Sequence, residues 1–168
     1  LLLSNQKRVC QECDKNEKCE LLHAARLTGA RDNAYTGAKT ETTVDKLTPS
    51  IKRDTSKCVL CGRCIERCKN AHGLSVLGFE KRGFKTIVAP AENRSFKDSP
   101  CILCGQCVSV CPTGALMEVS EIEKVDEAMK AGKYVVVQTA PAVRAALGEE
   151  FGMPLGTLVT GKMEAALR

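Results

Sequence analysis

Cys58-Val-Leu-Cys-Gly-Arg-Cys-Ile-Glu-Arg-Cys68 and Cys101-Ile-Leu-Cys-Gly-Gln-Cys-Val-Ser-Val-Cys111 are two copies of one pattern, C-x2-C-x2-C-x3-C, and Pro112 follows the second copy. This doubled spacing is typical of two [4Fe–4S] clusters in which the fourth cysteine of each run ligates the other cluster. Three thiolates from one short loop reach three corners of a cubane, and the fourth corner needs a cysteine from elsewhere. The pattern therefore predicts two clusters, each held by both runs.

The cysteine count argues against two common alternative uses of cysteine. The chain has eleven cysteines, an odd number, and its sequence shows nothing like a signal peptide, which disfavours the disulfide framework of a secreted protein. Structural zinc sites usually take paired C-x2-C units. Evenly stepped runs of four cysteines fit that arrangement poorly, so we expect iron–sulfur clusters.

Composition bounds the class of protein. The chain contains four Phe, two Tyr and no Trp, so we expect the clusters to replace part of the usual apolar core. No stretch approaches the roughly 18 apolar residues of a membrane span, and we expect a cytoplasmic protein. The formal charge of +5 counts the cysteines as neutral, whereas metal-bound cysteines are thiolates. The positive charge therefore gives no reason to expect nucleic-acid binding.

A third cysteine group, Cys10, Cys13 and Cys19, reads C-x2-C-x5-C and supplies three thiolates. It can hold a cluster if a fourth ligand comes from elsewhere. His23 lies on a helix predicted over residues 20–28, where a surface or packing role is the simpler interpretation, and His72 is expected in a loop. We expect a third [4Fe–4S] cluster here and leave its fourth ligand open.

The chain divides by composition into four stretches. Residues 1–34 hold the three-cysteine group, residues 35–56 are expected to be a linker with short strands, residues 57–118 carry the doubled run, and residues 119–168 lack cysteine. Between the two runs, residues 82–90 predict a small strand or hairpin. The predicted fold class is α+β: a two-[4Fe–4S] module like that of bacterial ferredoxins, preceded by a small cysteine-rich segment and followed by the truncated start of an α/β domain.

Residues 119–168 show an alternating helix and strand pattern. Ser120 and Glu123 form a capping box, and Gly132 ends the predicted helix. The apolar run 134–137 is expected to be a buried strand. Pro141 is expected at the first position of the next helix, which would run to about residue 150.

One stretch of this region resembles a nucleotide-binding motif. Residues 156–163 read GTLVTGKM, close to the phosphate loop G-x-x-x-x-G-K-[ST]. Met163 stands where the hydroxyl residue belongs, and no clear strand leads into Gly156. An ordinary helix start is the better interpretation.

Residues 3–19 resemble the segment H-x3-C-x2-C-x5-C of the iron-only ([FeFe]) hydrogenases, of respiratory complex I and of some formate dehydrogenases. In these proteins the leading His ligates a [4Fe–4S] cluster, and here Gln6 stands in its place. An amide oxygen is a poorer ligand for iron than imidazole or thiolate. The cluster can then carry water or hydroxide at one iron, take His23 as ligand, or hold only three irons.

The remaining resemblance points to the hydrogenases in particular. Residues 135–152, with Gly156-Thr157 and residues 159–163, are similar to the beginning of the hydrogenase domain that houses the H-cluster. Residues 39–64, which lead into the first run, are similar as well. The Thr139-Ala-Pro-Ala-Val-Arg144 segment is specific, whereas the cysteine runs are shared by many unrelated electron carriers.

The resemblance implies an electron relay. Hydrogen is split or formed at a di-iron centre bridged to a cubane, and electrons pass along the accessory clusters, held here by residues 10–111, to ferredoxin or an NAD(P)-linked partner subunit. Ala140, Pro141 and Ala142 match the stretch that lines the H-cluster pocket, although the residues alone indicate only a turn. The cysteines of the H-cluster lie downstream in the family. This chain by itself is therefore expected to carry electrons without turning over hydrogen.

A second function stays open, that of a non-catalytic electron-transfer module in a complex I-type or formate dehydrogenase subunit. Either function implies a redox partner protein, and both allow a multi-subunit complex. The chain starts at Leu1 without an initiator Met and stops at Arg168 inside an apparently helical stretch. We therefore expect it to be a piece of a longer polypeptide.

Overall fold

A computed structural model of the protein describes residues 2–6, 10–30, 35–37, 39–40 and 42–167. The end residues Leu1 and Arg168, which bear on the expected longer polypeptide, lie outside this range. The chain forms two compact units, Leu1–Ser120 and Glu121–Arg168. Each unit is described by itself.

The first unit is built on a small antiparallel sheet. Its strands are β1 (Val44–Asp45), β2 (Ile51–Asp54) and β5 (Leu116–Glu118), in the order β1-β2-β5. Two strands from the stretch expected to be a linker thus share a sheet with the end of the cysteine module. β3 (Gly78–Glu80) and β4 (Ile87–Ala89) form a separate hairpin, which confirms the strand predicted before Pro90.

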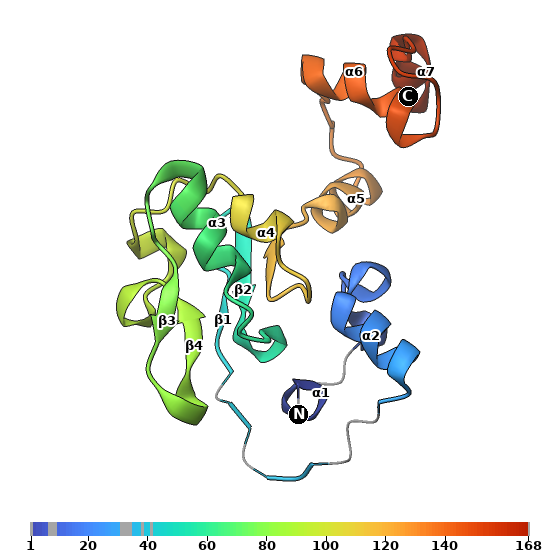
Figure 1. Ribbon diagram of the computed structural model, residues 1–168. Coiled ribbons are helices and arrows are strands. Elements are labelled where there is room, and N and C mark those ends of the chain that lie inside the picture. Colours follow the sequence, from blue (N-terminus) through green and yellow to red (C-terminus); the bar gives the residue numbers. More distant parts are fainter. Residues whose placement is uncertain (1, 7–9, 31–34, 38, 41, 168) are drawn as a thin grey trace. The chain divides into compact units, whose positions relative to one another are not determined.

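Two helices carry the later cysteines of the two runs. α3 (Arg63–His72) follows the first cysteine loop and α4 (Gln106–Ser109) follows the second. Figure 1 shows α3 and α4 side by side next to β2. His72, expected in a loop, is the last residue of α3, because the helix continues to the left-handed Gly73 (φ 66°).

The core of this unit contains the cysteines themselves. Eight buried side chains pack together: Ile51, Leu77, Val88, Phe96, Cys107, Cys111, Ala115 and Leu116. Cys58, Cys64 and Cys101 pack against this group from its edge. The single large aromatic of the cluster, Phe96, is 2% exposed. The core is small, and two of its eight buried members are cysteines; that clusters replace part of the usual core stays a prediction.

The N-terminal segment lies against the loop that follows Cys111. It contains α1 (Leu2–Asn5) and α2 (Glu20–Thr28), and α2 has the predicted bounds, with Gly29 left-handed at its end. The backbone N–H of Glu20 donates to the Pro112 carbonyl at 3.0 Å. Arg63 pairs with Glu20 at 2.8 Å, and Lys52 pairs with Asp14 at 2.5 Å.

The second unit consists of helices α5 (Ile122–Lys130), α6 (Pro141–Glu150) and α7 (Thr160–Ala166). Pro141 opens α6 as predicted, and the chain leaves α5 through the left-handed Gly132. α7 begins within the stretch that resembles a phosphate loop, as expected for an ordinary helix start. No helix in the described part of the chain is long and apolar enough to cross a membrane.

Two predictions for this unit are wrong. Residues 134–137 form no strand and are exposed, with Tyr134 at 95% and Val136 at 78%. An apolar β-branched run becomes a strand only by pairing with another strand, and none occurs among the described residues of this unit. The helix α5 has Glu121, not Ser120, at its N-cap position, where the Glu121 carboxylate pairs with Lys124 at 2.6 Å.

Gly114 tests how the N-terminal segment docks. A Cβ at Gly114 would lie 2.8 Å from Lys15 Cβ and 2.9 Å from Met117 Sδ, and its φ is +71°. Gly73 has a similar φ of +66° with nothing within 4 Å. We expect Gly114→Ala to cost the backbone strain of about 1–2 kcal/mol plus overpacking of about 1–3 kcal/mol, and Gly73→Ala to cost the strain alone.

The measurement is the melting temperature at one scan rate under anaerobic conditions, with limited proteolysis of residues 10–28. Gly114→Ala should melt lower than Gly73→Ala and be cleaved faster in that segment. Equal melting temperatures and equal cleavage in the two variants would contradict the docking shown by the structure.

Candidate iron–sulfur centres

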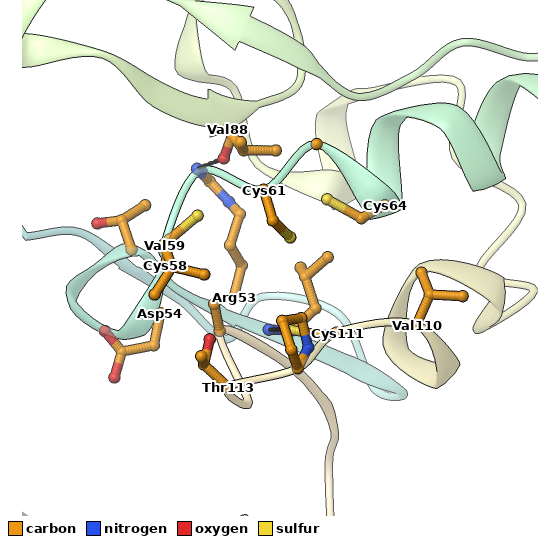
Figure 2. A pocket seen from close by; sticks show the side chains of 15 residues that line it. Arg53, Asp54, Cys58, Val59, Cys61, Cys64, Val88, Val110, Cys111 and Thr113 are labelled. Carbon is orange, nitrogen blue, oxygen red and sulfur yellow. Dashed lines mark hydrogen bonds between the residues drawn. The ribbon is translucent and has the colours of Figure 1, made fainter. Parts of the chain in front are cut away.

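The first pocket of the cysteine module is lined by cysteines from both runs. Cys58, Cys61 and Cys64 come from the first run and Cys111 from the second. Figure 2 shows their side chains around one space, which measures about 450 Å³ including its opening to solvent. The other walls have six apolar residues, Val59, Val88, Val110, Pro112, Ala115 and Leu116, and four polar or charged ones, Arg53, Asp54, Thr55 and Thr113.

The second pocket repeats this arrangement with the runs exchanged. Cys101, Cys104 and Cys107 come from the second run, and Cys68 comes from the first. Its space measures about 380 Å³ including its opening. Its walls are also largely apolar: Ile51, Leu74, Val76, Leu77, Phe96 and Ile102. The structure therefore brings the eight cysteines of the doubled run together as two crossed sets of four.

The two cysteine loops have the same local conformation. The N–H of Leu60 donates to Cys58 Sγ, and the N–H of Leu103 donates to Cys101 Sγ, both at 3.4 Å. Gly62 and Gly105 both have φ of 74° and precede the helices α3 and α4. A left-handed residue at these positions favours glycine. The loops thus turn sharply enough to direct successive cysteines toward one pocket.

The helix α3 connects the two pockets. Cys64 lines the first pocket and Cys68 lines the second. Four residues correspond to about one helical turn, a rise of about 6 Å. The two sets of thiols therefore lie next to each other along one rigid element.

The chemistry of the donors fits iron–sulfur clusters. Burial raises the pKa of Cys64 and of Cys107 to about 12, so without metal both remain thiols at neutral pH. Bound iron has to displace those protons, which couples cluster binding to folding. The thiols surround a space rather than a point, since no group of three or more His, Cys, Asp or Glu in the described residues is placed to hold a single ion. A donor set made only of sulfur favours iron–sulfur clusters or zinc, and eight thiols arranged as two crossed fours match the two-cubane pattern.

The three-cysteine group is less assembled. Cys13 lines a polar pocket with residues 14–18, 108–109 and 116–118, and neither Cys10 nor Cys19 lines that pocket. Cys10 and His23 are exposed, and Cys19 precedes α2. A third cluster at these residues stays a prediction.

Gln6 makes a contact that the sequence did not reveal. Its Nε2 donates to the Lys57 carbonyl at 2.8 Å, and Thr113 Oγ1 donates to the same carbonyl at 2.6 Å. Lys57 precedes Cys58, so both bonds hold the first cysteine loop. No short-range pattern connects Gln6 with a residue 51 positions away.

The remaining predicted site residues lie in the second unit. Ala140 is the N-cap residue of α6, and Pro141 and Ala142 form its first turn. All three are exposed. The structure describes them as the turn into a helix, and their role at an H-cluster stays a prediction.

Two family models match this chain. The ferredoxin-like domain of NADH-quinone oxidoreductase subunit 3 matches residues 48–117, and the C-terminal domain of the iron-only hydrogenase large subunit matches residues 133–168. The first match includes both crossed pockets. The second begins just before the exposed apolar run and contains Ala140, Pro141 and Ala142.

Two curated relatives align with essentially the whole chain. The NADP-reducing hydrogenase subunit HndD of Solidesulfovibrio fructosivorans is 47% identical over 100% of this chain, and iron hydrogenase 1 of Clostridium pasteurianum is 42% identical over 99% of it. The chain spans 29% of the length of each relative. A solved NAD+-reducing [NiFe]-hydrogenase shares the fold, with a TM-score of 0.64 and 22% identity over 71% of this chain and 51% of that one.

Paired cysteine substitutions test the crossed arrangement. Cys58→Ala with Cys111→Ala removes two thiols from one pocket, whereas Cys58→Ala with Cys68→Ala removes one thiol from each. We expect the first double variant to lose one cubane's worth of iron and the second to lose iron from both sites. Iron and sulfide analysis after anaerobic reconstitution measures both losses, and the reverse ranking would contradict the crossed pockets.

Proposed function

The chain belongs to the family of the iron-only hydrogenases, and on that premise we propose that residues 10–111 are an electron relay between an H-cluster and an external carrier. The observation that carries the proposal is the pair of crossed four-cysteine pockets joined by α3. The match of residues 133–168 to the hydrogenase C-terminal domain supports an H-cluster as one end of the relay.

The chain's own residues have three tasks in such a relay. Eight cysteines hold two clusters: Cys58, Cys61, Cys64, Cys68, Cys101, Cys104, Cys107 and Cys111. The apolar walls limit water at the thiols, and the N–H groups of Leu60 and Leu103 stabilise negative charge on Cys58 and Cys101. A bound [4Fe–4S] cluster supplies storage of one electron at a time. Because Cys64 and Cys68 lie one turn apart, electrons need to cross only a short distance between the sites.

We propose that Cys10, Cys13 and Cys19 hold a third cluster of the relay. Gln6 does not supply imidazole, and its amide nitrogen is engaged with the Lys57 carbonyl. The fourth ligand is then water or hydroxide, or His23, or the cluster keeps three irons.

The same proposal assigns Ala140, Pro141 and Ala142 to the wall of an H-cluster pocket in the whole protein. Pro141 has no backbone N–H, and the position of Ala140 and Ala142 at the N-terminus of α6 leaves their N–H groups without intrahelical partners. All eleven cysteines lie between residues 10 and 111, so this chain alone should not turn over hydrogen. We propose a cytoplasmic location and a ferredoxin or an NAD(P)-linked subunit as redox partner.

A second candidate function is a non-catalytic module of the complex I type. The match of residues 48–117 to a domain of NADH-quinone oxidoreductase subunit 3 favours it. It leaves the match at residues 133–168 without explanation, so the hydrogenase relay remains the better proposal.

Electron exchange tests the relay. The reconstituted chain 1–168, reduced with dithionite and freed of excess reductant, should be reoxidised by a bacterial two-[4Fe–4S] ferredoxin in stopped-flow absorbance. It should evolve no hydrogen with reduced methyl viologen. A fully loaded chain that exchanges no electrons with the ferredoxin or with a small redox dye would contradict the relay, and exchange with the dye alone would exclude this ferredoxin as the carrier. Hydrogen evolution would contradict the absence of a catalytic centre.

The third cluster is tested by its iron load and by Gln6→His. We expect near three cubanes' worth of iron and sulfide in the wild-type chain, with the Cys10 site the most easily lost because its fourth ligand is weak. Gln6→His should slow its loss to a chelator and change its electron paramagnetic resonance signal. Gln6→Ala is the control, since it breaks the bond to Lys57 without adding a ligand. A load that stops at two cubanes in all three proteins would remove this site.

A further inference from the structure

The first pocket contains a buried cation that the cysteine pattern does not predict. Arg53 lies on β2, is 4% exposed and lines this pocket together with its four cysteines. Figure 2 shows its side chain running past Cys58 and Cys61 toward Val88. Arginine is almost never fully buried unless it is paired, so its contacts need to be accounted for.

Arg53 donates hydrogen bonds to neutral oxygens, and its Nε–H donor is left without an acceptor in the part of the chain that the structure describes. Nη1 donates to the Val88 carbonyl at 3.2 Å, and both Nη1 and Nη2 donate to Asn93 Oδ1 at 3.1 Å. Nε is buried and has no hydrogen-bond partner among the described residues. A buried charged group with an unused N–H is costly unless a further acceptor or a negative charge is present.

Two carboxylates lie near Arg53, and one of them, Asp54, also lines the first pocket, where it is more exposed than Arg53. Asp45 accepts hydrogen bonds from the Ser95 hydroxyl and the Phe96 N–H, and Asp54 accepts from the Ser56 N–H and hydroxyl. Burial lowers the pKa of Arg53, whereas negative charge at Asp45 and Cys58 raises it. The guanidinium stays protonated in any protein environment, and Arg53 lines the pocket together with the four cysteines, so its positive charge acts on them as well as on the carboxylates.

The second pocket has no counterpart. Its described lining residues include no Lys, Arg, Asp or Glu, and its titratable groups are His72 and the four cysteines. The two crossed sets of thiols therefore match in loop conformation, and among their described lining residues only the first has a deeply buried cation in its wall, with Asp54 at its more exposed edge. Reduction adds one negative charge to a cluster, and a fixed cation in a poorly solvated wall stabilises that charge.

We propose that Arg53 raises the reduction potential of the cluster held by Cys58, Cys61, Cys64 and Cys111, and so makes this cluster the first of the two to be reduced. The proposal rests on the proposed function only in requiring that both clusters assemble. In this proposal Arg53 ligates no iron. Its charge sets the order of the two reduction potentials.

The test is a potentiometric titration of the reconstituted chain, followed by electron paramagnetic resonance, with iron and sulfide analysis of each sample. Arg53→Met should lower the midpoint potential of one wave by at least about 59 mV. For one electron, this shift corresponds to a tenfold change in the ratio of reduced to oxidised cluster. The wave of the cluster held by Cys101, Cys104, Cys107 and Cys68 should move little, as should that of the third cluster. Cys61→Ser, which alters one ligand of the same cluster, should shift the same wave and so identify it.

Matched variants separate charge from packing. Arg53→Lys keeps the cation and should retain most of the wild-type midpoint, and Arg53→Gln is a second neutral variant that can still donate to the Val88 carbonyl. Lys52→Met removes the same charge from the neighbouring residue, which pairs with Asp14 on the more exposed side of β2, and should leave the wave unchanged.

The outcomes are distinct. Failure of the wild-type chain to assemble both clusters would overturn the proposed function. Three results would overturn the role of Arg53. One is a full iron load with an unchanged midpoint potential in either neutral variant. The others are equal shifts in the waves of the two crossed clusters, or a shift in Arg53→Lys as large as that in Arg53→Met. If neither neutral variant binds its full complement of iron, the order of reduction in the wild-type chain tests the proposal. The proposal is then wrong if the cluster ligated by Cys61 is reduced after the cluster ligated by Cys104.

Discussion

The fourth thiol of each cysteine run is the constraint on which the first unit depends. A run of this spacing can place three thiols around one pocket, and the fourth has to come from a chain segment some forty residues away. Cys68 and Cys111 meet that requirement only if α3 and α4 pack together. The pairing of β2 with β5 brings residue 111 back toward residue 58. The small core then forms around the thiols, with Cys107 and Cys111 among its buried members.

The two cysteine loops have the same conformation, whereas the charges beside the two pockets differ, and these two features have different effects. Leu60 and Leu103 hold the first cysteine of each run in the same way, and Gly62 and Gly105 make the same turn. This repetition fixes two equivalent sets of donors. Potentials, however, depend on the charges around a cluster as well as on its ligands. On our proposal, the buried Arg53 beside one of the two pockets makes the reduction potentials of the two clusters unequal.

The sequence predicted most strongly where local chemistry decides the outcome. The cysteine spacing predicted the two crossed sets, and the start of α6 at Pro141 and the end of α2 at Gly29 followed from the conformational preferences of proline and glycine. It failed for the strand at 134–137, because a strand needs a partner that no local pattern specifies. It also missed Arg53, since a single arginine in a short strand with alternating burial resembles a surface residue until the sheet shows which face is buried.

The Lys57 carbonyl shows how the two parts of the first unit are coupled. It accepts hydrogen bonds from Gln6, which belongs to the N-terminal segment, and from Thr113, which follows the second run. The next residue is Cys58, whose sulfur accepts the N–H of Leu60. One carbonyl thus joins three distant stretches beside the first cysteine of one pocket. Displacement of Gln6 removes one of the two donors to this carbonyl and frees the backbone before Cys58, so the stability of the first pocket depends on how firmly the N-terminal segment docks.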